Sequence, residues 1–259
     1  MLKLPKRIFL QQGGILLDYK GSAVYDNADF FYNYLLRRNR ADSPNNIIEK
    51  PVIYDLMGDV LGKKVLDLGC GDAKFGYELL EQGCIFYEGV EGSSNMVKAA
   101  KELLKTSKSE IHHATMESWN YPKEKYDLVI SRLAIHYLQD LEPIFDSIRS
   151  ALIPNGQFIF SVQHPVLTSS MKSATTSERK SDWIVDNYFE MGKRMEPWIG
   201  ESVVKYHRTF EEYFQSLKHV GFKIEDIREC KPNPQFFNSE GEYKRRMRIP
   251  LFLVFKCIK

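Results

Sequence analysis

The stretch VLDLGCGDAKFG, from Val65 to Gly76, decides the fold of this chain. Its apolar start reads as the end of a buried strand, Gly69-Cys70-Gly71 reads as a glycine-rich turn, and the residues after it have helical composition. Glycine has no Cβ and adopts backbone angles closed to other residues, so a ligand can lie against this turn. The free N–H groups of a helix beginning near Ala73 would face the same place. The stretch therefore predicts a ligand site between a strand and a helix.

An acid at the end of the next apolar run supports this interpretation. Glu91 closes the run IFYEGVE, residues 85–91. A carboxylate in that place can accept hydrogen bonds from both hydroxyls of a ribose. Together, the turn and the acid predict a nucleoside-containing cofactor.

These residues resemble motif I and the second-strand acid of the class I S-adenosylmethionine (SAM) dependent methyltransferases. Asp67 fills the family's acidic place two residues before the first glycine, and Ser93 and Met96 follow Glu91 as a Ser and a Met commonly do. The resemblance is strong over roughly residues 45–160 and looser in the C-terminal third. It implies a methyltransferase that uses SAM and releases S-adenosylhomocysteine (SAH).

Two further stretches extend the resemblance. The run from His113 to Glu117 looks like the loop that contacts adenine, and YDLVISRLAIHYL from Tyr126 looks like the fourth strand and its loop. The chain departs from the family at two positions. Ala73 stands where the family has a glycine of motif I, a change that a helix start should tolerate, and Thr115 stands where the family often has Asp. The cofactor-binding residues that the resemblance implies are Asp67, Gly69, Cys70, Gly71, Glu91, Gly92, Ser93, Met96, Thr115, Met116, Glu117, Ser131, Arg132 and Leu133.

The middle of the chain alternates strand and helix patterns, which favours a parallel sheet buried on both faces. Helices are predicted over 74–82, 94–104, 141–152 and 210–220. The late apolar runs FKIEDIREC and RIPLFLVFKCI should pair as a hairpin without a helical crossover. We therefore expect an α/β, Rossmann-like sheet of seven strands, mostly parallel with an antiparallel last strand, and helices on both faces.

At 259 residues the chain suits one domain with added segments. We expect a lid segment over residues 1–55, a SAM-binding core over 56–163, a cap insertion over 164–208, and a helix with a strand hairpin over 209–259. The basic start MLKLPKRIFLQQGGILL reads as an ordinary N-terminal segment, because QQGG interrupts its apolar part.

The lid and the cap each allow two interpretations. Aromatic residues at helical spacing in AVYDNADFFYNYLLRRNR, residues 23–40, either pack on the core or form a lid in which Tyr25 and Arg38 reach the SAM carboxylate. The cap is long and aromatic, and it leaves the sheet at the ends of the strands, where ligands bind. Its aromatic residues either wall an acceptor pocket or form a small core of their own. The proposed substrate-binding residues are Trp183, Tyr188, Trp198 and Tyr206, with Phe189 as a further wall.

Methyl transfer from SAM asks mainly for positioning, since acceptor atom, methyl carbon and sulfur must be collinear. A hydroxyl or protonated amine acceptor would also need a base. The candidates for this base are His136, His164 and His207. The alternative for each of them is a purely structural role. We expect His164 and His207 to converge near the transferable methyl.

Composition bounds the partners. The net charge of +2 gives no drive towards nucleic acid or membrane, no apolar run is long enough to span a bilayer, and the four cysteines lack metal spacing. We therefore expect a cytoplasmic protein with a small-molecule acceptor and no metal. The sequence does not predict the oligomeric state or the accepting atom, which is oxygen, nitrogen or carbon.

Three alternatives stay open. An NAD-dependent oxidoreductase would place a small residue where Lys74 stands in the glycine fingerprint. A nucleic-acid methyltransferase would use the basic clusters at 37–40 and 244–248, but the Asn/Asp-Pro-Pro-aromatic motif of the amino methyltransferases is replaced by Ser-Arg-Leu-Ala at 131–134. The third alternative is a protein that binds SAM without catalysis.

Overall fold

A computed structural model describes residues 18–105, 108–170, 172 and 182–259. The stretch expected to be an ordinary N-terminal segment, and the part of the cap over 173–181, lie outside the described residues.

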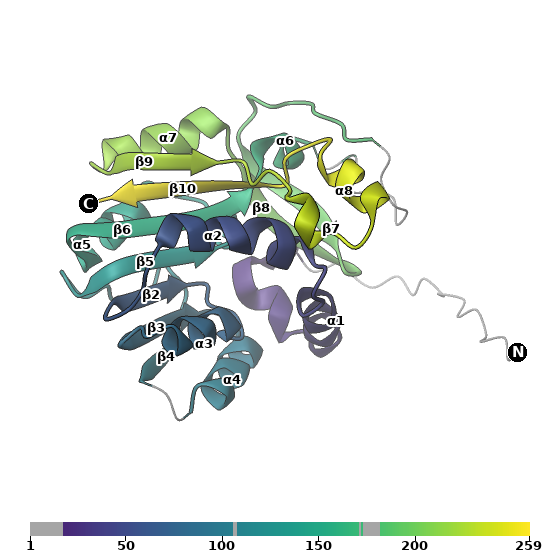
Figure 1. Ribbon diagram of the computed structural model, residues 1–259. Coiled ribbons are helices and arrows are strands. Elements are labelled where there is room, and N and C mark those ends of the chain that lie inside the picture. Colours follow the sequence, from purple (N-terminus) through teal and green to yellow (C-terminus); the bar gives the residue numbers. More distant parts are fainter. Residues whose placement is uncertain (1–17, 106–107, 171, 173–181) are drawn as a thin grey trace, which may run out of the picture.

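Seven strands form the central sheet, in the order β4-β3-β2-β5-β6-β10-β9 (Figure 1). All neighbours from β4 to β6 pair in parallel, while β10 runs antiparallel to both β6 and β9. The expected sheet, mostly parallel with an antiparallel last strand, is confirmed. The strands are β2 (Lys64–Leu68), β3 (Phe86–Glu91), β4 (Ser109–His113), β5 (Tyr126–Arg132), β6 (Leu152–Gln163), β9 (Lys223–Arg228) and β10 (Phe252–Ile258).

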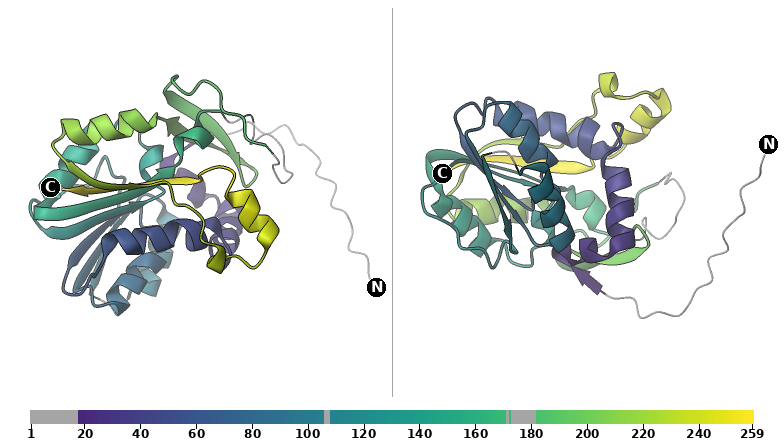
Figure 2. Two further views of the ribbon diagram at one scale, coloured as in Figure 1. Left: turned by 45° about the horizontal axis from the view of Figure 1, so that its top comes forward. Right: turned by 90° about the horizontal axis from the view of Figure 1, so that it is seen from below.

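Helices cover both faces of the sheet because consecutive strand residues point to opposite sides and the central strands bury apolar residues on both (Figures 1 and 2). In β5, for example, Val129 packs with α5 (Glu142–Ala151) and α7 (Phe210–His219), whereas Leu128 and Ile130 pack with α2 (Lys50–Met57) and the helices after it. The two helices that complete this second face are α3 (Lys74–Glu81) and α4 (Ser94–Leu103).

The residue before each helix shows how that helix begins. Ser93 caps α4 by accepting a hydrogen bond from the Met96 N–H, and Thr209 caps α7 in the same way from the Glu212 N–H. Ala73, before α3, has a φ of +55°, in the left-handed region that costs a non-glycine residue roughly 1–2 kcal/mol. The helix start therefore accommodates Ala73, as expected, with some backbone strain.

Two segments far apart in the sequence join beyond the ends of the strands. The N-terminal segment comprises β1 (Asp18–Lys20) and η1 (Gly21–Asp26), followed by α1 (Ala28–Arg38) and the π-helical turn η2 (Asn45–Glu49). The cap contains the short helix α6 (Pro165–Thr168) and an antiparallel hairpin of β7 (Gly192–Trp198) and β8 (Glu201–His207). Strand β1 pairs in parallel with β8, so lid and cap share a second, three-stranded sheet that the sequence did not predict (Figure 2).

The C-terminal hairpin needs one correction. A 3₁₀ turn, η5 (Pro234–Phe236), and the short helix α8 (Glu240–Arg246) lie between β9 and β10, where the sequence predicted no helix. The two strands still pair antiparallel, because α8 lies beside the end of the sheet rather than across its face (Figure 1).

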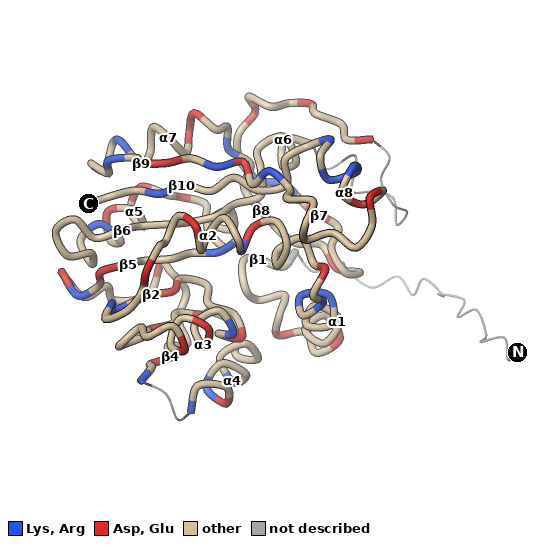
Figure 3. The backbone as a smooth tube through the Cα atoms, viewed as in Figure 1, with Lys and Arg blue, Asp and Glu red and all other residues tan. Residues whose placement is uncertain are grey.

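Charges of both signs are interspersed along the elements (Figure 3). Among the described residues, no helix is both long enough and apolar enough to cross a membrane.

Two glycines in helices allow a matched test of this packing. A Cβ on Gly76 of α3 would lie 2.2 Å from the Tyr87 ring, whereas one on Gly241 of α8 would meet only the Ser239 hydroxyl at 3.8 Å. We expect Gly76→Ala to lower the free energy of unfolding by about 1–3 kcal/mol through overpacking. Gly241→Ala should be neutral or stabilising by up to about 1 kcal/mol. Urea denaturation measures both, and equal effects would contradict the close packing of α3 on β3.

Candidate functional site

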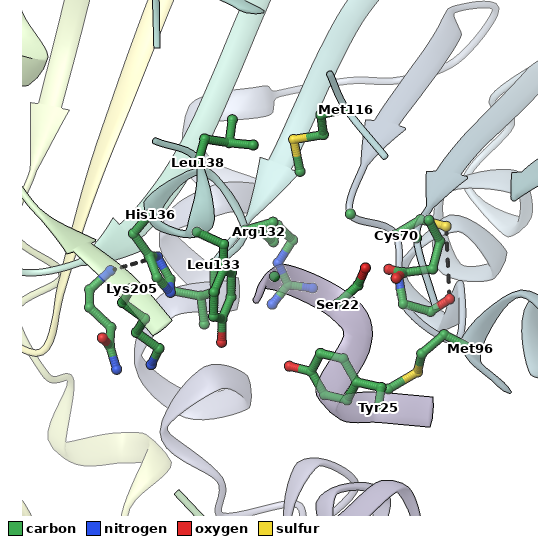
Figure 4. A pocket seen from close by; sticks show the side chains of 18 of the residues that line it. Ser22, Tyr25, Cys70, Met96, Met116, Arg132, Leu133, His136, Leu138 and Lys205 are labelled. Carbon is green, nitrogen blue, oxygen red and sulfur yellow. Dashed lines mark hydrogen bonds between the residues drawn. The ribbon is translucent and has the colours of Figure 1, made fainter. Parts of the chain in front are cut away.

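A cavity of about 690 Å³ lies where the parallel strands end, and the lid and cap segments close it (Figure 4). This volume is typical of small-molecule sites, which measure roughly 300–1,000 Å³. One end of the cavity is lined by the glycine turn, the end of β3 and the loop after β4. The other end is lined by the loop after β5 and by β8.

Glu91 is the polar centre of the first end. Its carboxylate accepts hydrogen bonds from the Gly71 N–H at 3.0 Å and the Ser93 N–H at 2.8 Å. These two bonds join the glycine turn to the start of α4. Burial raises the pKa of Glu91, while the backbone N–H groups oppose that shift. The carboxylate is therefore held in place and still borders the cavity.

Two glycines admit close contacts at this end. A Cβ on Gly69 would lie 2.5 Å from the Cβ of Ala134, and one on Gly92 would lie 2.2 Å from the hydroxyl of Ser22. Gly69 also has a φ of +76°. Any larger residue would push the loop after β5 or the lid away from the turn, so these glycines keep the cavity narrow at its base.

A buried ion pair lies beneath the cavity. Arg132, at the end of β5, donates hydrogen bonds from Nε and Nη2 to the Glu49 carboxylate of η2, and both side chains are almost fully buried. The Ser161 hydroxyl of β6 donates to the same carboxylate at 2.7 Å. The Arg132 guanidinium also lies over the Phe75 ring, 4.5 Å from its centroid. This pair ties the N-terminal segment to the sheet.

The lid also holds the rim of the cavity. Asp26 accepts hydrogen bonds from the hydroxyls of Ser93 and Ser94 and from the Asn95 N–H at the start of α4. Tyr25 lines the cavity with Met96 beside it (Figure 4). Arg38 lines it too, and its guanidinium donates to the Asn46 side chain at 3.1 Å.

Aromatic rings join the lid to the cap. Tyr25 and Tyr34 of the lid pack edge-on against Trp198 of β7, with centroids 6.2 and 5.6 Å away. Burial raises the pKa of the Tyr25 phenol well above its ordinary value, and the same holds for Tyr137. Both hydroxyls therefore stay protonated at neutral pH.

His136 and Lys205 lie at the second end of the cavity (Figure 4). The Gln163 N–H donates to Nδ1 of His136 at 3.4 Å, and burial, together with the positive charges of Lys205 and Arg208, holds the pKa of His136 well below its usual range. Lys205 has a side chain only 2% exposed and is paired with the Glu196 carboxylate.

The other two candidate histidines are placed elsewhere. His164 caps α6 through Nδ1, which accepts from the Val166 N–H, and its Nε2 bonds to Glu229 at 3.0 Å. His207 is fully buried, with Nδ1 bonded to the Thr168 hydroxyl at 2.7 Å and Nε2 to a backbone carbonyl at 2.8 Å. Neither lines the cavity, so the structure does not bring them together there as the sequence predicted.

Most of the predicted cofactor set lines the cavity. The residues found there are Tyr25, Arg38, Asp67, Gly69, Cys70, Gly71, Glu91, Gly92, Met96, Thr115, Met116, Glu117, Arg132 and Leu133. Ser93 and Ser131 do not line it: Ser93 caps α4, and the Ser131 hydroxyl donates to the Leu68 carbonyl at 2.8 Å.

Two of the four predicted substrate-binding residues line the cavity, and the other two lie elsewhere. Trp198 and Tyr206 line the cavity, whereas Trp183 lies between Arg245 and Arg248 of the C-terminal segment, whose guanidinium groups are 5.5 and 5.3 Å from its ring. Tyr188 packs on His207 instead, at 5.7 Å between ring centroids. Of these two, only Tyr188 fits the interpretation as a small core within the cap.

Sequence reasoning missed several lining residues, notably Tyr34, Tyr137, Gln163 and Lys205. Tyr34 stood in the aromatic helix four residues after Phe30, and this helical spacing could have identified it. Lys205 gave no signal, because the hairpin that buries it was not predicted.

A group of three possible metal ligands lies away from the cavity: Glu88, Glu110 and His112, within 4.8 Å of one another. Glu88 already accepts hydrogen bonds from Lys125 and from the Tyr126 hydroxyl. Its contacts are accounted for as an ion-pair cluster on the sheet.

Comparison with known proteins places these features in context. Residues 66–160 match a family of methyltransferase domains. The chain is 31% identical over 249 residues to an uncharacterized protein of Haemophilus influenzae, covering 92% of this chain and 97% of that protein. A solved structure of a putative S-adenosylmethionine dependent methyltransferase from Listeria monocytogenes is similar with a TM-score of 0.74 and 31% identity, covering 82% of this chain and 96% of that one. Phosphoethanolamine N-methyltransferase 1 of Arabidopsis thaliana is 24% identical over 217 residues, which cover 82% of this chain and 42% of that protein.

Asp67 provides a test of the electrostatics at the base of the site. Burial raises its pKa from 3.8 to about 6, while the Tyr87 hydroxyl donates to it at 2.8 Å. Between these values the folded state keeps a proton that the unfolded chain has lost, so this group's contribution to stability falls as the pH rises from about 4 to 6.

We expect Asp67→Asn, which does not titrate and still accepts from Tyr87, to gain roughly 2–3 kcal/mol relative to the wild type between pH 4 and pH 7. Chemical denaturation of both proteins at each pH measures this difference. Parallel stability profiles would contradict it.

Proposed function

Because this chain belongs to the class I SAM-dependent methyltransferases, we propose that it transfers the methyl group of SAM to a small molecule enclosed by the lid and the cap. The cavity carries this proposal. It is continuous from the glycine turn to Lys205, and the segments that close it are the lid and cap of this chain itself. SAM supplies a methyl group on a positively charged sulfur, and SAH is the product.

The residues at the first end fit the cofactor. Glu91, fixed by two backbone N–H groups, has further lone pairs for the ribose hydroxyls, and Gly71 of the turn faces open space, which leaves room for a ligand. Residues Thr115 to Glu117 border the place for adenine. We assign Arg38 and Tyr25 to the carboxylate of the methionine moiety, because both reach the cavity from the lid.

The lid and the cap argue against a large acceptor. The aromatic rings of Tyr25, Tyr34 and Trp198 close the cavity over the loop after β5. A base inside a duplex would have to be extruded to reach such a place. The near-neutral charge also provides little attraction for phosphates. Nucleic-acid methylation is the second candidate, and its support is the basic run from Lys244 to Arg248.

Cofactor binding is tested through Glu91. We expect Glu91→Ala to weaken SAH binding by about 10- to 100-fold, because charge-assisted hydrogen bonds contribute roughly 1.5–3 kcal/mol. Isothermal titration calorimetry measures the affinity, and the melting temperature shows whether the variant is folded. The matched control is Glu81→Ala, which removes an exposed acid at the end of α3. This variant should bind SAH as the wild type does. Unchanged SAH affinity in folded Glu91→Ala, or tighter binding of NADH than of SAH, would contradict the cofactor site.

The acceptor class is tested by competition between substrates. Purified protein is given tritiated SAM with a metabolite library in one series, and with transfer RNA, ribosomal RNA or duplex DNA in another. We expect SAH release with a small molecule and none above background with nucleic acid at physiological salt. Comparable rates with RNA would overturn the small-molecule proposal, and SAH binding without turnover on either series would favour a non-catalytic SAM-binding role.

A further inference from the structure

The hydrogen-bonding groups at the second end of the cavity define what can bind there. We propose that this end takes a carboxylate, which the protein methylates on oxygen to a methyl ester, and that Lys205 holds the carboxylate. This inference rests on the proposed function and adds the acceptor class to it. It comes from an excess of hydrogen-bond donors and a lack of any free base among the described residues at this end.

Lys205 has donors to spare. An ammonium group has three N–H bonds, and the one hydrogen-bond partner of Lys205 among the described residues is the Glu196 carboxylate. The ammonium lies 4.9 Å from the centroid of Trp198 and 5.4 Å from that of Tyr137. The faces of these two rings hold the ammonium at the cavity wall through cation–π contacts, which do not use its N–H groups in conventional hydrogen bonds. Two N–H bonds are therefore left for a ligand.

His136 is a donor too. Its Nδ1 accepts the Gln163 N–H, and the ring is neutral because burial and two nearby cations lower its pKa. A neutral imidazole that accepts through Nδ1 carries its proton on Nε2. Nε2 has no partner among the described residues, so His136 is able to donate to a ligand. It is unsuited to the role of general base that the sequence suggested.

No carboxylate at this end lacks a partner among the described residues. The side-chain oxygen of Gln139 accepts from the Tyr206 hydroxyl at 3.2 Å, and Glu196 accepts from Lys205 and, at 3.5 Å, from the Gln163 amide. The acids that line the cavity are Asp67, Asp72, Glu91 and Glu117, all of them on the turn, strand end and loop of the cofactor side. The donors left over on Lys205 and His136 therefore favour a ligand that brings lone pairs and a negative charge to this end.

The lack of a base decides between the accepting atoms. An amine is protonated at neutral pH and must lose a proton before or during methyl transfer, whereas a carboxylate, with a pKa of about 4, is already ionised. A lone pair of the carboxylate oxygen forms the new O–C bond, the C–S bond breaks, and its electron pair stays on sulfur. The products are a neutral methyl ester and SAH, and no proton is released.

Two variants separate a binding role of Lys205 from a purely structural one. Lys205→Met removes the ammonium group and keeps an unbranched side chain that is one heavy atom shorter, and Glu196→Gln removes the partner's charge while keeping an oxygen that accepts from Lys205. If the ion pair only supports the hairpin, the two variants should have similar effects. If Lys205 holds an anion, Lys205→Met should weaken the anion's binding, and Glu196→Gln should leave it unchanged or strengthen it.

Binding is measured by calorimetry on the SAH-loaded protein with matched probes: phenylacetate, benzoate and hexanoate against their amides. We expect at least one carboxylate to bind the wild type tightly and its amide weakly. Lys205→Met should weaken that carboxylate by about 10- to 100-fold and leave SAH affinity and the melting temperature near wild type. If Lys205→Met alone is unstable, the double variant with Glu196→Gln is measured instead, since it removes both charges. No preference for any carboxylate over its amide would overturn the inference.

Turnover gives a second, independent readout. The same carboxylates, together with the amines phosphoethanolamine and benzylamine, are supplied with SAM in weak buffer with a pH indicator. Ester formation should release SAH with no proton, whereas N-methylation would release one proton per SAH. Amine methylation that survives Lys205→Met with an unchanged KM would overturn the carboxylate assignment and leave the small-molecule function standing. Methylation of nucleic acid alone would overturn both.

Discussion

The buried ion pair of Arg132 and Glu49 is the interaction on which the rest of the site depends. It joins η2 to the end of β5, and the Ser161 hydroxyl extends it to β6. Removing one partner of such a pair leaves a buried charge and typically costs about 3–5 kcal/mol. Since Arg132 also lines the cavity, the same contact that anchors the lid forms part of the floor beneath the ligands. A substitution at Arg132 would therefore disturb both the anchor of the lid and the wall of the cavity.

The two ends of the cavity differ in charge because their charged side chains come from different segments of the chain. Acids reach it from the glycine turn and the ends of β3 and β4, where backbone N–H groups and nearby side chains stabilise them. The cation Lys205 reaches it from the cap. A parallel sheet collects the first set at one edge by its topology alone, whereas the second depends on a separate hairpin. The central sheet thus forms the end that we assign to the cofactor, and the cap adds Lys205 to the end that we assign to the acceptor.

This division also explains how much the sequence predicted. The sheet, its antiparallel last strand and helices α3, α4, α5 and α7 follow from periodicity and from the glycine turn, because these elements are set by local pattern and burial. Glu91 and the glycines followed from the motif. The failures cluster in the cap: His164 and His207 stand at suggestive positions in the chain, but their ring nitrogens are taken up by Glu229, Thr168 and backbone groups. Such long-range partners leave no trace in local spacing.

The ladder between β1 and β8 has a consequence for how the protein assembles. Asp18 pairs with Ser202, so the whole of the central sheet's first five strands lies between the two partners in the chain. Closing so long a loop is entropically costly until the intervening chain is compact, and β1 contributes only three residues to the pairing. We therefore expect the roof of the cavity to form last and, because the β1–β8 ladder is short, to open first. Its opening requires no disruption of the seven-stranded sheet. A bound ligand that contacts both the lid and the cap should therefore slow the hydrogen exchange of the β8 amides.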